Sequence, residues 1–195
     1  RAGQPYWGYR FMGWAMHYLN DLSMPYHASV MPAKRSLGML WINLKAMLGF
    51  PRSRDNAVVL LSNRHTVYEH FQWLELRRAY LEGNRNHPFM LALTAPSEVI
   101  PYHDAFPVKV AARESAKIAR KSDRLLVRNV PRELVRDPSQ TLESSELDNL
   151  TGRILAEKGQ GAVDEITDMI ASRFRSLSMH VKSFVAHVLE EGSGS

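Results

Sequence analysis

The chain of 195 residues contains no cysteine. Disulfide bridges and thiolate metal ligands are therefore excluded, and any metal ion has to be held by nitrogen and oxygen atoms. A chain without cysteine fits a secreted or periplasmic protein, which is the location we expect, although cytosolic proteins also lack cysteine. No secretory signal is visible, and a truncated start would not show one.

The sequence also lacks long apolar runs and alternating patterns. No run reaches the roughly 18 to 20 apolar residues of a membrane-spanning helix, so we expect that the chain does not cross a membrane. No segment of length alternates between apolar and polar residues as a half-buried strand does, and no internal repeat is evident. Helical periodicity dominates, and the sequence therefore predicts an all-α fold, a multi-helix bundle.

The composition is that of a globular protein with excess positive charge. Hydrophobic residues make up 45% of the chain, charged residues make up 23%, and the net charge is +5. The basic clusters favour an anionic partner, either lipid headgroups or nucleic acid, and a solvated surface is the simpler interpretation of any single cluster. These clusters are Lys34 with Arg35, Arg77 with Arg78, and Arg120 with Lys121.

Helical spacing of apolar residues divides the chain into successive segments. Helices are predicted at residues 6–22, 37–50, 57–81, 108–121, 147–157 and 161–191. The first is apolar around most of its circumference, which is typical of a central bundle helix. Residues 83–107 and 122–145 contain most of the prolines and are predicted as loops, with one helical turn near 132–135. We expect residues 1–191 to form one domain and residues 192–195 to be a tail.

Two pairs of side chains have the spacing of metal ligands on a helix. His17 and Asp21 lie four positions apart, as do His65 and Glu69, so each pair shares one helix face. His27 follows a proline that ends the first helix, and we expect the turn to direct it back toward the pairs. Imidazole and carboxylate groups suit zinc when three or four converge. The sequence therefore predicts a metal site between central helices, formed by these five residues.

Each pair could also form without a metal. His17 could be a core histidine, with Asp21 closing its helix, although an aspartate at a helix C-terminus is unfavourable with respect to the helix dipole. His65 and Glu69 could form an exposed ion pair. The remaining histidines are predicted to lie outside the site: His70 on another face of its helix, His87 and His103 in a loop, and His180 and His187 flanking the polar side of the last helix.

The two motifs resemble those of a known family. Residues 17–27, HYLNDLSMPYH, resemble the metal-binding segment of the bacterial zinc-dependent phospholipases C, and residues 65–71, HTVYEHF, resemble the second ligand helix of that family. The related fungal zinc nucleases that cut single strands usually pair histidine with aspartate in this helix. Glu69 therefore favours the phospholipases.

The resemblance implies an activity and a role for each ligand. It implies hydrolysis of phospholipid headgroup esters by metal-activated water, with two or three zinc ions in a complete site. His27, His65 and Glu69 would bind one zinc, whereas His17 and Asp21 would serve a neighbouring zinc, with Asp21 bridging to a further ion. A phospholipid or membrane surface would be the substrate, and nucleic acid is the less favoured partner. No general acid or base is identified.

The chain departs from the family in two respects. The family draws further ligands from residues upstream of its first ligand helix, and residues 1–10 contain no Asp, Glu or His. The chain is therefore expected to be N-terminally incomplete, so that an upstream segment or second chain completes the site, or else to be a domain that never had those ligands. This chain alone would then hydrolyse slowly or not at all. Residues 33–56 also look like an insertion.

The sequence does not decide where the segment 37–50 packs or which of three functional classes the chain belongs to. This segment is strongly apolar, carries Trp41 and has Lys34, Arg35 and Lys45 beside it, so it predicts a helix that lies in a lipid interface or packs into the core or onto a missing segment. Three functional classes are compatible with the sequence: a phospholipase C-like hydrolase, a zinc nuclease, or an inactive helical binding module. In a nuclease, aromatic residues near the start could stack nucleic acid bases, although core packing accounts for them more simply; they are Tyr6, Trp7, Tyr9 and Trp14.

Overall fold

The computed structural model describes residues 4–29 and 36–193, and these residues form eight α-helices, two short helices of other types and no strand. The predicted all-α fold is therefore confirmed. The elements are α1 (Pro5–Ser23), α2 (Ser36–Met47), α3 (Arg52–Leu81), α4 (Pro88–Thr94), the π-helix η1 (Pro107–Ala112), α5 (Arg113–Asn129), α6 (Arg132–Arg136), the 3-10 helix η2 (Ser144–Leu147), α7 (Leu150–Lys158) and α8 (Gln160–Ser193).

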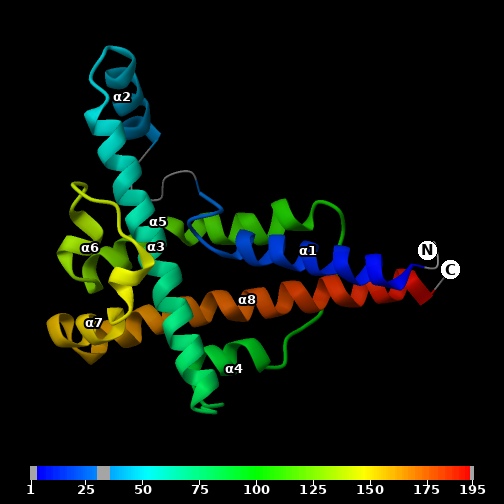
Figure 1. Ribbon diagram of the computed structural model, residues 1–195. Helices are drawn as coiled ribbons and strands as arrows, with labels where there is room; N and C mark the ends of the chain where they lie inside the picture. Colours follow the sequence, from blue (N-terminus) through cyan, green and yellow to red (C-terminus); the bar gives the residue numbers. More distant parts are fainter. Residues whose placement is uncertain (1–3, 30–35, 194–195) are drawn as a thin grey trace.

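Two long helices organise the molecule. Helix α3 has 30 residues and α8 has 34, and they cross near the middle of the structure (Figure 1). Helices α1, α4, α5 and α7 pack along α8, whereas α6 and α7 pack against α3. The first helix therefore ends close to the middle of α3, where the predicted metal ligands of both segments lie.

The main core forms where helices of different sequence regions meet. Val67, Tyr68 and Phe71 of α3 are buried with residues of α4, α5, α7 and α8. Their spacing of one, three and four positions places them on one side of the helix. A smaller cluster around Leu19 and Phe184 attaches α1 to α8. Both segments that carry the predicted ligands are thus anchored by apolar packing.

The prediction that α1 lies at the centre of the bundle is wrong. Its aromatic side chains are 46% to 69% exposed, and only one side of the helix contacts η1, α5 and α8. An apolar circumference shows that a helix can be surrounded, but not that the chain supplies enough elements to surround it. The exposed side chains are Tyr6, Trp7, Tyr9, Phe11, Trp14 and Tyr18.

Helix α2 is also exposed, which contradicts packing of residues 37–50 into the core. In the part of the chain that the structure describes, its main contacts are with α3, and α2 projects from the remaining helices together with the first turns of α3 (Figure 1). Lys34 and Arg35, with the start of the predicted insertion, lie outside the described residues.

Other boundaries differ from the predictions in smaller ways. The predicted loop at residues 83–107 contains α4, because Pro88 occupies the first turn of a short helix capped by His87. Helix α8 extends to Ser193, into the predicted tail, and residues 194–195 lie outside the described residues. Among the described residues, no helix combines the length and the apolar character needed to span a bilayer.

Candidate metal centre

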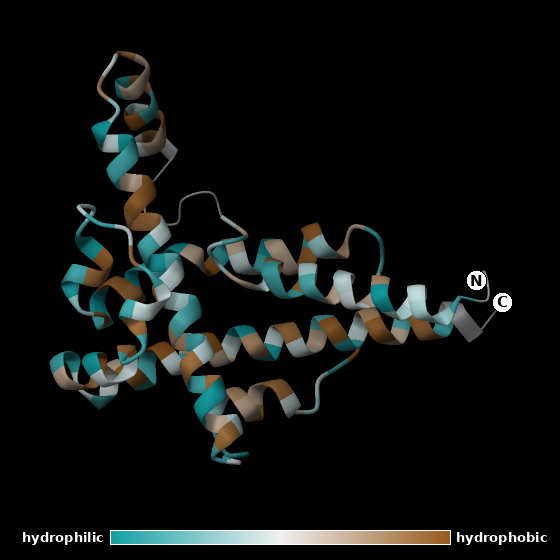
Figure 2. Ribbon diagram, in the orientation of Figure 1, coloured by the Kyte–Doolittle hydropathy of each residue, from teal (hydrophilic) through white to brown (hydrophobic). Residues whose placement is uncertain are grey.

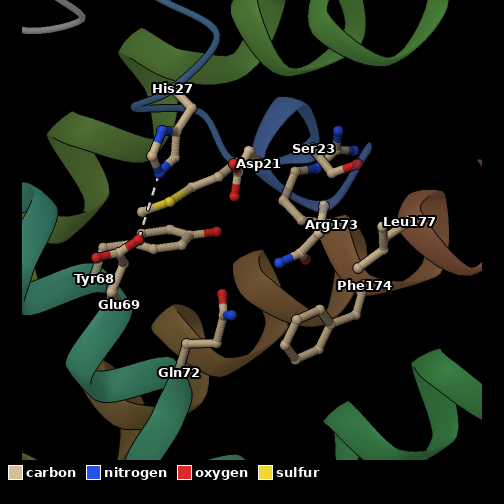
Figure 3. Close-up of a pocket in the computed structure, with 11 residues that line it drawn as sticks. Asp21, Ser23, His27, Tyr68, Glu69, Gln72, Arg173, Phe174 and Leu177 are labelled. Atoms are coloured by element: carbon tan, nitrogen blue, oxygen red, sulfur yellow. Dashed lines mark hydrogen bonds and ion pairs between the residues drawn. The ribbon is translucent and has the colours of Figure 1, made fainter. Parts of the chain in front are cut away.

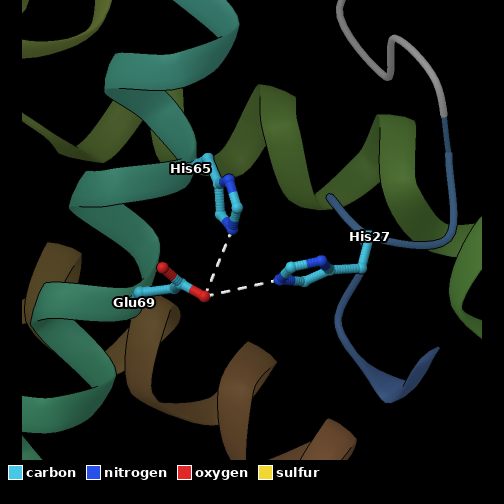
Figure 4. A group of neighbouring side chains, drawn as sticks. All are labelled: His27, His65 and Glu69. Atoms are coloured by element: carbon cyan, nitrogen blue, oxygen red, sulfur yellow. Dashed lines mark hydrogen bonds and ion pairs between the residues drawn. The ribbon is translucent and has the colours of Figure 1, made fainter. Parts of the chain in front are cut away.

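His27, His65 and Glu69 converge in the structure. One ligand atom from each lies within 4.8 Å of the others. Among the described residues, no other three His or acidic side chains come together in this way. The Nε2 atoms of His65 and His27 lie 3.2 Å and 3.5 Å from the same oxygen, Oε1 of Glu69 (Figure 4). Three of the five predicted ligands are therefore brought to one point.

Two separate elements position these ligands. His65 and Glu69 lie one turn apart on α3, in the stretch whose opposite side is buried in the core. His27 lies in the turn after α1, where its backbone N–H donates to the carbonyl oxygen of Met24. Pro25 ends the helix because its ring removes a backbone donor. The turn then directs His27 across to α3, as the sequence predicts.

The electrostatics of the group suit a cation. The neighbouring His65 imidazole is the main cause that lowers the pKa of Glu69; partial burial opposes it, and His27 lowers the pKa further. Glu69 is therefore ionised at neutral pH. The Nε2 atom of His65 is buried and has no hydrogen-bond partner of good geometry among the described residues, despite its closeness to Glu69. A buried imidazole nitrogen without a partner fits a metal ligand, since an unsatisfied polar atom is costly.

A buried carboxylate on α5 connects the two ligand segments. Asp123 accepts a hydrogen bond from the Tyr26 hydroxyl at 3.1 Å and two from Nη1 of Arg64, each at 3.1 Å. Tyr26 directly precedes His27, and Arg64 directly precedes His65. The Tyr26 ring also stacks on the His65 ring, with centroids 5.9 Å apart. Asp123 thus holds both histidine segments to α5 and fixes their relative position.

The other predicted pair lies beside this group. His17 and Asp21 approach to 3.5 Å, but the His17 side chain is 71% exposed and is not part of the three-residue group. Asp21 lines a small cavity that is shared with His27 and Glu69 (Figure 3). The structure therefore places Asp21 next to the candidate site and His17 at its outer margin.

Arg173 of α8 is a site residue that the sequence did not reveal. It lines the same cavity (Figure 3), and its Nε atom is buried without a hydrogen-bond partner among the described residues. Arg173 lies three residues after Ile170 and four residues before Leu177, so it shares their side of the last helix, which is the signal that could have identified it. Asp123 gave a similar signal, because it lies between Ala119 and Leu126 on the buried side of α5.

The remaining histidines have other environments. The prediction that His180 flanks the polar side of the last helix is wrong, because His180 is only 1% exposed and its ring contacts Phe106. His187 packs against Tyr102. His70 is 3.9 Å from Asp148, and Nδ1 of His87 accepts a hydrogen bond from the backbone N–H of Phe89.

Comparisons with known proteins do not assign this centre. No protein-family model, no curated protein and no solved structure matches the chain. The functional argument therefore depends on the motifs and on the geometry of the site.

Proposed function

We propose that the chain is a zinc-binding helical protein whose metal centre hydrolyses phosphodiesters of phospholipid headgroups. The convergence of His27, His65 and Glu69 from two distant segments carries the proposal. Two imidazoles and one carboxylate form a ligand set found in catalytic zinc sites, where the fourth position is left open. The half-exposed side chains of His27 and Glu69 leave such an opening toward solvent.

A metal accounts for this group better than an ion pair does. Both histidines direct Nε2 at one oxygen of Glu69, and the His65 atom makes no good hydrogen bond among the described residues. The His27 contact is a long hydrogen bond of 3.5 Å, and two imidazole nitrogens gathered around one carboxylate oxygen suit a shared cation. A bound zinc ion would supply a Lewis acid and would lower the pKa of a coordinated water to about 7.

Residues around the cavity would bind and orient the substrate. The Arg173 guanidinium, with its buried Nε atom, is a suitable partner for the phosphodiester anion. Asp21 contributes a second carboxylate to the same cavity and is our candidate for a further ion, as the family resemblance implies. The His17 imidazole already approaches Asp21 to 3.5 Å and is 71% exposed, so it would contribute to that ion from the solvent side.

A zinc nuclease that cuts single strands is the second candidate. The aromatic side chains of α1 are exposed rather than buried, so core packing does not account for them. Exposed rings can stack unpaired bases. Glu69 in place of aspartate and the apolar α2 favour a lipid substrate, and we therefore place phospholipid first.

Zinc titration monitored by calorimetry and by thermal unfolding tests the metal centre. Zinc at a hundred times its dissociation constant should stabilise the folded protein by about 2.7 kcal/mol, which is about 5 to 10 °C in melting temperature for a chain of this size. His65→Ala should weaken zinc binding by more than the 10- to 100-fold typical of outer-shell substitutions. His103→Ala, at an exposed position outside the group, should bind zinc as the parent does. Equal affinity in His65→Ala would refute the centre.

Hydrolysis assays with added zinc distinguish the substrates. Release of phosphocholine from phosphatidylcholine vesicles that requires His65 supports the phospholipase, and cleavage of single-stranded DNA that requires His65 supports the nuclease. Zinc binding without either reaction would contradict the proposed hydrolysis and leave a metal-binding helical module. A folded protein that binds no zinc would leave the helical binding module as the remaining function.

A further inference from the structure

Helix α2 and the turn that follows it present apolar side chains to solvent. Seven large apolar residues between positions 37 and 50 are 43% to 85% exposed. Ile42 is the buried hydrophobic residue of α2, and the main contacts of this helix are with α3. The exposed residues are Leu37, Leu40, Trp41, Leu44, Met47, Leu48 and Phe50; together with Lys45 we call them the α2 tip.

The α2 tip lies at the N-terminal end of α3, away from the other helices (Figure 1). Figure 1 shows α2 and the first turns of α3 standing away from the other helices, and Figure 2 shows hydrophobic residues on this projection. Twelve residues at a rise of about 1.5 Å give a helix of about 18 Å. That length is shorter than the roughly 30 Å hydrocarbon core of a bilayer. The tip can therefore enter one leaflet but cannot cross the membrane.

The charge next to the tip is predominantly positive. Residues 36–54 contain Lys45, Arg52 and Arg54 and no Asp or Glu, and the Asp55 that follows pairs with Arg54. The Lys45 ammonium lies over the Trp41 ring, 5.4 Å from its centroid. Lysine and tryptophan beside an apolar surface are typical of protein segments at the boundary between headgroups and acyl chains. The basic side chains are placed to meet anionic headgroups while the apolar ones enter the leaflet.

We propose that the α2 tip docks the protein onto an anionic lipid bilayer. Docking uses residues far from the metal centre and does not depend on the proposed hydrolysis. A second copy of this chain is a poorer occupant, because two tips brought together would oppose Lys45 and Arg52 with the same groups, while the nearby Asp55 already pairs with Arg54. An anionic lipid surface instead gains from both the charge and the apolar area.

Co-sedimentation with vesicles of phosphatidylcholine and phosphatidylglycerol tests the proposal. The double variant Trp41→Ser/Leu44→Ser should reduce the partition coefficient by about tenfold or more, because two exposed apolar groups are lost from the membrane contact. The matched control is Trp73→Ser/Leu155→Ser. Trp73 and Leu155 are 51% and 47% exposed, and Arg77 lies over Trp73 as Lys45 does over Trp41.

Further measurements separate docking from other causes. Lys45→Glu should weaken binding to anionic vesicles more than to vesicles of phosphatidylcholine alone, and added salt should reduce this difference. His65→Ala should bind vesicles as the parent does, so a failed metal centre and failed docking give different results. Vesicle binding that is equal in the Trp41/Leu44 and Trp73/Leu155 variants would overturn the proposal. So would a dimer in sedimentation velocity that Trp41→Ser/Leu44→Ser abolishes while vesicle binding persists.

Discussion

Asp123 determines, at the scale of single residues, how the two histidine segments meet. Its carboxylate is 5% exposed, and the Arg64 side chain that it binds is 11% exposed. A buried ion pair of this kind contributes little net stability over an apolar replacement, but removal of one partner leaves the other charge unpaired. The pair therefore acts mainly through position, and it positions the residues that precede His27 and His65.

The substitution Asp123→Asn should affect both stability and metal binding. Urea denaturation should show a loss of about 3 to 5 kcal/mol, because Arg64 would remain buried without a counter-charge. Calorimetric zinc titration should show at least tenfold weaker binding, because Tyr26 and Arg64 would no longer hold the ligand segments together.

A matched control removes a carboxylate from an exposed ion pair. Glu133→Gln breaks the pair with Arg153 at the surface and should cost at most about 1 kcal/mol, with unchanged zinc affinity. Asp123→Asn with the parent's zinc affinity would show that the Asp123 network does not position the ligands.

His180 should make stability depend on pH. Burial lowers the pKa of His180; the nearby Glu114 carboxylate raises it in part, and Arg173 lowers it further. The folded state therefore binds a proton less readily than the unfolded chain, whose histidines titrate near pH 6.5. The stabilising contribution is complete above about pH 6.5 and decreases as the pH falls from there toward the lower pKa of the folded state.

The substitution His180→Leu isolates this contribution. The free energy of unfolding of the parent should fall more steeply with decreasing pH below about 6.5 than that of the variant, whatever the offset between the two curves. Urea denaturation at a series of pH values measures both slopes. Parallel curves would show that His180 takes up its proton equally in both states.

The connection between α7 and α8 depends, at the scale of elements, on one glycine. Gly159 ends α7 with φ of 83°, and its backbone N–H donates to the carbonyl of Leu155. With ψ of 172°, this positive-φ conformation is occupied almost only by glycine, and a residue with a Cβ adopts it at a cost of about 1 to 3 kcal/mol. A Cβ at Gly159 would have no described atom within 4 Å, so any effect of substitution comes from the backbone alone.

Two glycine substitutions two positions apart should change the stability of the protein in opposite directions. Gly159→Ala should destabilise the protein by about 1 to 3 kcal/mol, whereas Gly161→Ala, in the first turn of α8, should stabilise it by about 0.4 to 1 kcal/mol. Gly161 also has open space for a Cβ among the described residues. Thermal and urea denaturation compare both variants with the parent. A stabilising Gly159→Ala would contradict the positive-φ conformation at the junction.

At the scale of the whole molecule, buried apolar contacts are unevenly distributed among the helices. The main core joins α3 to α4, α5, α6, α7 and α8, whereas α2 is attached mainly to the first part of α3. Segments with few buried apolar contacts open at lower free energy than the core. The α2 tip therefore has the freedom to rearrange on a lipid surface without disturbing the metal centre.

Amide hydrogen exchange should detect this difference. In solution, amides of α2 should exchange much faster than those of α8 around Ile166 and Ile170, which are fully buried. Anionic vesicles should protect α2 selectively, and mass spectrometry of peptides resolves the two helices. Equal protection of α2 and the centre of α8 in solution would contradict the weak attachment of the tip.

Helical periodicity alone determined the all-α class, the long helix α3 and the position of His65 and Glu69 on one face of it. Proline chemistry and spacing also predicted a turn that directs His27 to α3. These features are local, because neighbours along a helix or turn meet whatever surrounds them. The assignment of zinc and of a phospholipid substrate remains a prediction.

Only the tertiary structure decided what each face meets. It left the aromatic residues of α1 and the apolar residues of α2 exposed, buried His180, placed Asp21 and not His17 beside the cavity, and brought Arg173 and Asp123 to the site. Apolar spacing identifies which side chains share a face, but burial depends on whether other elements are available to cover that face. Contacts between distant segments follow from the packing of whole helices, which no local pattern specifies.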